Sequence, residues 1–191
     1  MGDGARQSRA QISRHSKPPV TTVPSLIVDD RTSGDLNSNL GTRWEFIADT
    51  VMGGVSRGGL AAEVVDGHPC LHLTGQVSLA NNGGFLQAGL DLRPAGLLDA
   101  RGWSGIELVV RGNDETYNLH LRTVDTRIVW QSYRASFPAG RQWATVRLPF
   151  AGFQPYRIDR PLDLSVLRRL GLVAIGREMA VDLYLSCISF Y

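Results

Sequence analysis

Apolar and polar residues alternate through most of the chain after residue 25. Ile106, Leu108 and Val110, for example, are separated by Glu107 and Val109 and followed by an arginine. Because successive side chains of a strand point to opposite faces, this pattern predicts a strand with one buried face. Similar patterns predict strands at 43–47, 60–65, 70–79, 84–91, 117–121, 127–137, 144–148, 170–175 and 181–188.

Only one segment has the features of a helix. Asp163 is a suitable N-cap for a short turn through Leu164, Leu167 and Arg168. A parallel α/β fold needs a helix after most of its strands, and the sequence has no room for them. Many short strands with almost no helix favour an all-β fold, and we predict a jelly-roll β-sandwich.

Length and charge divide the chain into a tail and one domain. The 191 residues are enough for a single hydrophobic core. Residues 1–24 carry four basic residues against one acidic residue and end in prolines, so we expect a disordered basic tail there and the sandwich at 25–191. The net charge of +2 therefore belongs to the tail, and we expect no nucleic-acid partner for the domain.

The expected compartment is the cytoplasm. No apolar run approaches the roughly 20 residues that cross a bilayer, so we expect no direct membrane insertion. The first 20 residues also lack the apolar core of an export signal. In a eukaryote, the arginine- and serine-containing tail would leave an organelle matrix or stroma as the alternative. Cys70 and Cys187 lie in apolar strand-like runs, which favours buried thiols over a disulfide.

The sequence offers weak candidates for catalysis. Residues 54–58 spell G-x-S-x-G, the pattern around the nucleophile of α/β-hydrolases, but the helices of that fold are missing. A serine hydrolase using Ser56 is therefore only a minor alternative. His120 lies on the polar face of its strand, where we expect an exposed or hydrogen-bonded side chain rather than a general base. We expect no enzyme activity, no catalytic residue and no cofactor.

Candidate metal ligands are equally weak. His68 and His72 lie on one face of a strand but roughly 13 Å apart, too far to share one zinc ion. Asp29, Asp30 and Asp35 form a small acidic run that suits either a hard cation or solvated turns. We assign no metal site.

Two glycine-rich loops, at 44–59 and 75–85, stand out. Their glycines, small polar residues and large apolar residues fit two interpretations. They are tight turns held by side-chain-to-backbone hydrogen bonds, or they meet and present a binding surface. The candidate partner- or ligand-binding residues are Asp49, Met52, Gly53, Gly54, Ser56, Asn81, Asn82, Gly83, Gly84 and Phe85.

The same loops carry a family resemblance. After Trp44, residues 49–56 read D-T-V-M-G-G-V-S, and residues 81–85 read N-N-G-G-F. The chain resembles the family of the NADH:ubiquinone oxidoreductase (complex I) intermediate-associated protein of 30 kDa over about residues 26–190. It departs from the family at 176–179, where a G-P-F run is often found. Further agreement lies at 105–112, 117–119, 143–153 and 170–172.

The resemblance implies a galactose-binding-domain-like jelly roll that binds rather than catalyses. It further implies an assembly factor or chaperone for a membrane complex, either complex I-like or photosynthetic. The expected partners are protein subunits or assembly intermediates of that complex.

Carbohydrate binding is the alternative, since a related sandwich family binds glucans. A sugar site needs aromatic platforms beside hydrogen-bonding side chains. The candidates are Trp103, Trp130, Tyr133 and Trp143, of which Trp130 and Trp143 fit the core equally well.

Overall fold

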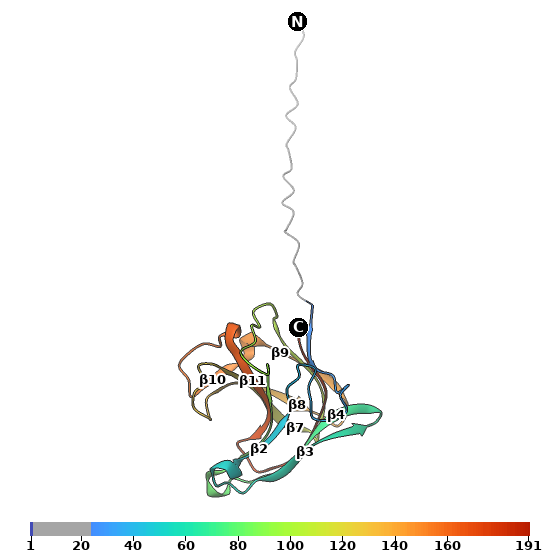
Figure 1. Ribbon diagram of the computed structural model, residues 1–191, viewed down its shortest axis with the longest axis vertical. Coiled ribbons are helices and arrows are strands. Elements are labelled where there is room, and N and C mark those ends of the chain that lie inside the picture. The colour runs from blue at the N-terminus through green and yellow to red at the C-terminus, as the bar shows by residue number, and fades with distance from the viewer. Residues whose placement is uncertain (2–23) are drawn as a thin grey trace.

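The computed structural model describes Met1 and residues 24–191 (Figure 1). The expected basic tail therefore lies almost wholly outside the described residues, and the boundary at residue 25 stays a prediction. Within the described part, no helix has the length and apolar character needed to cross a membrane.

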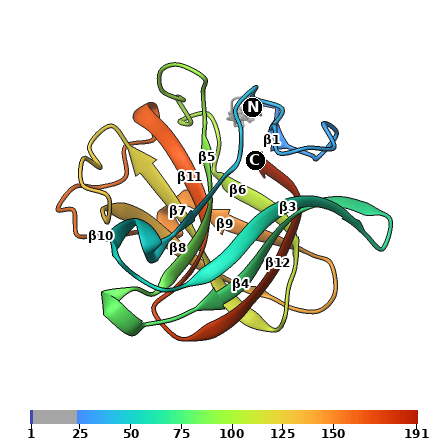
Figure 2. The same cartoon turned by 60° about the horizontal axis from the view of Figure 1, so that its bottom comes forward.

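The strands form two antiparallel sheets, which Figure 2 shows packed against each other. The first sheet has the order β3-β4-β12-β6-β9, and β1 also pairs with β12. Its strands are β1 (Leu26–Asp29), β3 (Arg57–Val65), β4 (His68–Val77), β6 (Gly105–Arg111), β9 (Ala144–Pro149) and β12 (Met179–Phe190).

The second sheet has the order β10-β8-β7-β11-β5-β2. Its strands are β2 (Glu45–Ala48), β5 (Phe85–Asp91), β7 (Glu115–Thr123), β8 (Ser132–Ala139), β10 (Gln154–Tyr156) and β11 (Leu167–Ile175). Within residues 24–191, four short 3-10 helices connect strands: η1 (Asp49–Met52), η2 (Ala80–Asn82), η3 (Phe150–Gly152) and η4 (Leu164–Val166).

The hydrophobic core lies between the two sheets. Along β7, Tyr117, Leu119 and Leu121 are fully buried in it, and along β12 Leu183 and Leu185 meet them from the other sheet. Within each strand these residues are two positions apart, because successive side chains of a strand point to opposite faces of the sheet. The predicted all-β jelly-roll sandwich is confirmed, and alternation in the sequence is the reason it could be predicted.

Local sequence fixes the turns as well. Asp66 and Gly67 join β3 to β4 with φ values of 51° and 78°. Two left-handed residues are what the commonest two-residue hairpin turn requires, and Asp-Gly is a favoured pair there. Asp163 caps η4 by accepting a hydrogen bond from the Ser165 N–H, so the predicted cap and helical turn are present. The turn ends at Val166, however, and Leu167 and Arg168 belong to β11.

Two segments differ from the expectation. The strand predicted at 127–137 begins only at Ser132, because residues 124–131 form a loop. Strand β10, with three residues and a proline, was not predicted at all. Its proline lies on an edge strand, where a missing N–H costs no hydrogen bond within the sheet.

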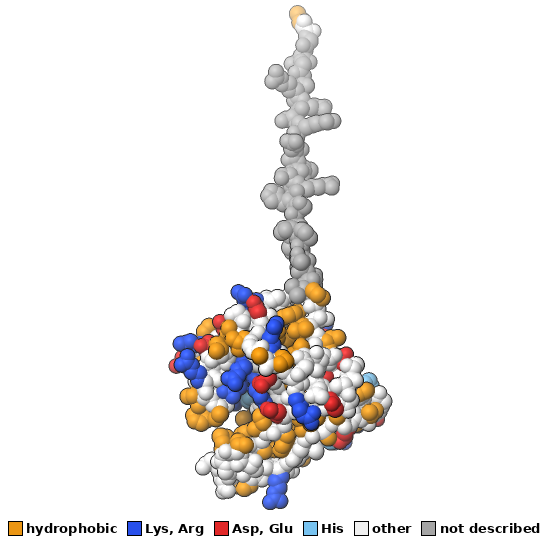
Figure 3. Space-filling model, viewed as in Figure 1, with side chains coloured by type: hydrophobic (Ala, Val, Ile, Leu, Met, Phe, Trp, Pro, Cys, Tyr) orange, Lys and Arg blue, Asp and Glu red, His pale blue; other side chains and the backbone are white. Residues whose placement is uncertain are grey.

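The second sheet curves around a hollow. In Figure 1 the ribbon of this sheet bends between β10 and β11 at one end and η1 and η2 at the other, and Figure 3 shows the hollow itself. The space-filling view in Figure 3 shows blue arginine side chains along one edge of it and orange hydrophobic side chains along the other. The face of the sheet turned away from the core is called the outer face below.

Candidate functional site

One buried carboxylate joins the two glycine-rich loops. Asp49 has no exposed surface, and its Oδ1 accepts a hydrogen bond from the Ser56 N–H at 3.0 Å. Its Oδ2 accepts hydrogen bonds from the Ser56 hydroxyl, from the Gly84 N–H at 2.6 Å and from the Phe85 N–H at 3.3 Å. The two loops therefore meet at Asp49, and in Figures 1 and 2 η1 and η2 lie side by side.

The Ser56 hydroxyl extends this link to a third segment. It accepts a hydrogen bond from the Ser78 N–H at 2.9 Å. Burial acts to raise the pKa of Asp49, but hydrogen bonds from the Ser56 hydroxyl and from three backbone N–H groups outweigh it and lower the pKa. A buried carboxylate with several N–H donors stays ionised, because each donor favours the charged form.

The glycines of the motif make room for this carboxylate. A Cβ on Gly54 would lie 2.3 Å from the Asp49 Cγ, and a Cβ on Gly83 would lie 2.5 Å from its Oδ2. Gly53 and Gly84 have φ values of 89° and 130°, which side chains disfavour. Close approach and backbone conformation thus account for all four glycines.

The two asparagines have a backbone role too. Asn81 and Asn82 both have φ of 57°, in the left-handed region. Asparagine visits this region more readily than most residues. Their side chains are exposed on η2, so they are free to contact another molecule while their backbone shapes the loop.

The predicted binding residues therefore divide into two groups. Asp49, Gly54, Ser56 and Gly84 are buried and hold the loops, Gly83 is partly buried beside them, and Phe85 is half-buried at the start of β5. Exposed at the surface are Met52, Gly53, Asn81 and Asn82. A binding role for these residues stays a proposal, since nothing in the fold alone requires a partner.

Exposed apolar residues gather on the same loops. Val51 and Met52 on η1 have 71% and 54% of their surface exposed, and Val55 and Leu79 flank the two short helices with 41% and 46%. We call these four residues the loop tip. Exposed apolar groups on adjoining rigid loops are typical of interaction surfaces.

Adding a methyl group in the space beside Asp49 is expected to destabilise the domain. Gly83→Ala would place a methyl group against the carboxylate and 3.1 Å from the Ala80 carbonyl oxygen, so we expect a loss of about 2 kcal/mol in the free energy of unfolding. Urea unfolding measures it. Gly59→Ala is the matched control, because a Cβ there meets nothing within 4 Å. Equal stability of both variants would contradict the close approach.

Ser56 is not placed as a hydrolytic nucleophile. Its hydroxyl is 1% exposed and is bonded to Asp49 and to the Ser78 N–H. A nucleophilic serine needs an accessible oxygen and a base that takes its proton during attack. The Ser56 hydroxyl instead links the two glycine-rich loops, and this structural role accounts for the serine in the G-x-S-x-G pattern.

The three acidic residues near β1 have separate partners. Asp29 is buried and pairs with Arg31 at 2.5 Å, while Asp30 accepts hydrogen bonds from Thr32 and from Asn39. Asp35 accepts from the Asn37 N–H and side chain. Within residues 24–191 no group of three or more histidine, cysteine or acidic side chains is placed to hold a metal ion.

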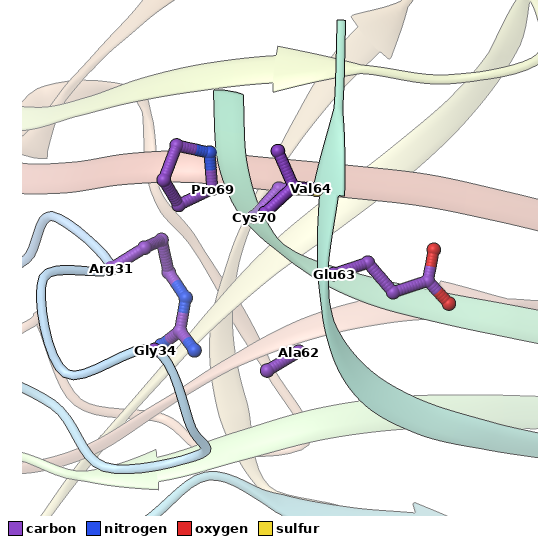
Figure 4. A pocket seen from close by; sticks show the side chains of 7 residues that line it. All are labelled: Arg31, Gly34, Ala62, Glu63, Val64, Pro69 and Cys70. Carbon is purple, nitrogen blue, oxygen red and sulfur yellow. The ribbon is translucent and has the colours of Figure 1, made fainter. Parts of the chain in front are cut away.

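The histidines of β4 belong to an aromatic cluster on the first sheet. His68 packs against Trp143 with tilted rings whose centroids are 5.1 Å apart, and His72 stacks on Tyr184 with ring centroids 4.1 Å apart. Cys70 between them is buried, and it and Cys187 are free thiols. A cavity of about 240 Å³ lies beside Cys70, and Figure 4 shows Glu63 pointing away from the Arg31 side chain across it.

The predicted aromatic platforms have different positions. Tyr133 is fully buried in the core, and Trp103 packs on Phe190 with its indole N–H donating to the Pro24 carbonyl. Trp143 packs on His68 as above. Among the four, Trp130 has 48% of its surface exposed, in the loop at 124–131.

The outer face of the second sheet holds residues that sequence reasoning missed. His120 lies there but is only 8% exposed, and its Nε2 has no hydrogen-bond partner among the described residues. The expectation of an exposed or hydrogen-bonded side chain is therefore wrong, because neighbouring strands cover the ring. Burial, with the Arg134 charge beside it, lowers the pKa of His120 to about 3, so the ring is neutral.

Arg134 lies next to His120, and Tyr156 and Arg157 lie beyond Arg134 at the edge of the sheet. Arg134 is the register partner of His120, and its guanidinium carbon lies 3.4 Å from the Tyr156 ring centroid. The guanidinium carbon of Arg157 lies 5.6 Å from the same centroid. Alternation along β8 could have placed Arg134 on the outer face, because the preceding residue, Tyr133, points into the core. Strand β10 itself could not be predicted from the sequence.

Comparison with known proteins places the chain in a family. The sequence model of the Complex I intermediate-associated protein 30 (CIA30) family matches residues 35–185. None of the curated proteins compared with the chain matches it.

Solved structures with the same fold are carbohydrate-binding modules. The family 11 module of the cellulosomal cellulase Lic26A-Cel5E of Clostridium thermocellum has a TM-score of 0.67 and 14% identity, over 89% of this chain and 95% of that one. The family 11 module in complex with a β-1,3-1,4-mixed-linked tetrasaccharide gives 0.65 and 13%, over 87% and 94%. A family 30 module gives 0.63 and 15%, over 88% and 87%. At these identities the likeness shows the fold alone.

Proposed function

Since the chain belongs to the Complex I intermediate-associated protein 30 (CIA30) family, we propose that it is a non-catalytic binding domain. In this proposal it acts as an assembly factor or chaperone for a membrane protein complex, complex I-like or photosynthetic. It binds protein subunits or assembly intermediates of that complex.

The observation that carries this proposal is the loop tip. Val51, Met52, Val55 and Leu79 are exposed on loops that Asp49 holds in place. A rigid support lowers the entropy lost on binding. Methionine adapts to apolar partner surfaces of irregular shape. Asn81 and Asn82 add exposed amides next to these apolar groups, so the surface offers both apolar contact and hydrogen bonds.

Co-migration with assembly intermediates tests the proposal. The chain is purified from its host and separated on native gels, and the subunits that migrate with it are identified. We expect Met52→Asp to remove these subunits, because a carboxylate at the centre of an apolar contact must be desolvated. Val64→Asp is the control, since Val64 is 70% exposed at the far end of β3. Identical partner sets for all three proteins would contradict the loop tip.

Carbohydrate binding is a second candidate, and the hollow over the outer face favours it. Tyr156 is 38% exposed at the edge of this face, and Trp130 is exposed on the loop beside it. Aromatic rings next to hydrogen-bonding side chains are what a sugar site needs. The solved structures of similar fold include one in complex with a tetrasaccharide.

Calorimetric titration with a β-1,3-1,4-mixed-linked tetrasaccharide tests the second candidate. We expect binding that Trp130→Ala weakens and that Val64→Asp leaves unchanged, because Val64 is exposed on β3, which belongs to the other sheet. Absence of heat at millimolar concentrations of this and other glucans would remove the candidate.

A further inference from the structure

The outer face carries positive charge that the described part of the chain does not neutralise. Arg134 is half-buried and donates its Nε–H to the Ser132 hydroxyl, which is neutral. Neither Arg134 nor Arg157 has a carboxylate within ion-pair distance among residues 24–191, whereas Arg160 pairs with Asp125 at 2.9 Å. A charge taken out of water without a counter-charge costs free energy, so an unpaired half-buried guanidinium calls for an explanation.

The support around these arginines is built rather than incidental. The Tyr156 ring lies 3.4 Å from the Arg134 guanidinium carbon, which fixes the plane of that fork. Arg157 has a φ of 55°, a left-handed conformation that a long side chain rarely adopts. The Gln131 amide holds it there by donating a hydrogen bond to the Arg157 carbonyl at 3.0 Å. Strained backbone of this kind collects at ligand sites.

A buried polar atom lies beside the same arginine. His120 is the register partner of Arg134, and its Nε2 has no partner in the described chain. Directly opposed side chains on neighbouring strands are about 5 Å apart at Cβ. The ring is neutral and adds no charge, so the site has a net positive charge from the arginines and a free imidazole nitrogen below them.

A cleft of about 450 Å³ adjoins this group. It is lined by Arg157 and Gln131 and by the apolar side chains of Ile128 and Ile158. Asp125, Asp159, Arg127 and Arg160 complete its lining. The cleft is thus large enough for a small organic molecule, and its lining combines three arginines and two aspartates with two isoleucines and Gln131.

We propose that Arg157, which lines this cleft, and Arg134, whose guanidinium lies over the same Tyr156 ring, bind the carboxylate of a small ligand at the edge of the cleft. A planar guanidinium matches a carboxylate with two parallel hydrogen bonds, and a neighbouring second guanidinium completes the charge balance. Uronate saccharides and small organic acids share this chemistry. The proposal does not rest on the loop tip or on an assembly role, and it requires a charge that a neutral glucan lacks.

Titration calorimetry with three probes tests the site on the full chain. The probes are trigalacturonate, its uncharged methyl ester, and citrate. We expect trigalacturonate or citrate to bind and the ester to bind at least about tenfold more weakly, because charge-assisted hydrogen bonds dominate. Binding of trigalacturonate alone identifies a saccharide source, and binding of citrate identifies a small acid.

Variants separate the site from general charge effects. Arg134→Gln and Arg157→Gln are each expected to weaken binding at least about tenfold, and Arg134→Lys is expected to weaken it less, since it keeps the charge but loses the planar fork. Arg57→Gln, an exposed position on β3, is the control and should bind like the unaltered chain. If Arg134→Gln fails to fold, the Arg157→Gln variant still tests the proposal, because Arg157 is exposed. Equal binding of acid and ester, no binding of any probe, or unchanged binding by Arg157→Gln would overturn the proposal.

Discussion

Asp49→Asn is expected to destabilise the domain by about 3 kcal/mol and to loosen both glycine-rich loops. The Asp49 carboxylate accepts hydrogen bonds from three backbone N–H groups and one hydroxyl. An asparagine has only one oxygen there, so its amide N–H groups would face other N–H groups. Buried donors without acceptors cost about 1–3 kcal/mol each. Urea unfolding measures the loss, and hydrogen exchange of the Gly84 and Phe85 amides locates it.

The pH dependence of that difference checks the cause. The pKa of Asp49 is lowered in the folded chain from its ordinary value of 3.8. A lowered pKa means that the carboxylate contributes stability above about pH 4, and that this contribution is lost as the pH falls through the folded value. The stability gap between the unaltered chain and Asp49→Asn should therefore stay constant above about pH 5 and narrow as the pH falls below about 4. A gap that stays constant would contradict the role of the charge.

Asp29→Ala is expected to cost about 3–5 kcal/mol, because it leaves a buried guanidinium without its counter-charge. Asp29 and Arg31 are 0% and 2% exposed and pair at 2.5 Å. The same carboxylate accepts a hydrogen bond from the Trp44 indole N–H at 2.6 Å. Trp44 is the aromatic residue that precedes the family motif, and this bond anchors it in the core.

A second pair of the same spacing supplies the control. Asp99 and Arg101 are also two residues apart and pair at 2.6 Å, but they are exposed. Asp99→Ala should leave the unfolding midpoint within the error of the measurement, since water and salt screen exposed pairs. The double variant Asp29→Ala, Arg31→Ala should cost less than the two single changes together. Additive effects would show that the buried pair is not coupled.

The sequence predicted the fold well because its signal is local. Alternation at β6, β7 and β12 needs only a few consecutive residues. Strand β10 was missed because three residues with a proline carry no alternation. Residues 127–131 of the loop were included in a predicted strand because Ile128, Val129 and Trp130 are apolar, but all three are exposed.

The candidate site was harder to predict because its contacts are distant in sequence. Asp49 bonds to Gly84 across 35 residues, and nothing local says that this carboxylate is buried rather than exposed. The sequence left two interpretations open for these loops, tight turns or a shared binding surface. The meeting of the loops at Asp49, and the split between buried supports and exposed residues, needed the structure. The burial of His120 was missed for a similar reason, because alternation assigns a side chain to a face but does not say how neighbouring strands cover it.

The most direct test of the central claim is photo-crosslinking from the loop tip. A photoreactive amino acid is placed at Met52 in one version of the chain and at Val64 in another, and crosslinked proteins are identified in the host. The account predicts that position 52 captures subunits or assembly intermediates of one membrane complex, and that position 64 does not. Crosslinks to the same proteins from both positions, or none from position 52 while the complex assembles, would contradict it.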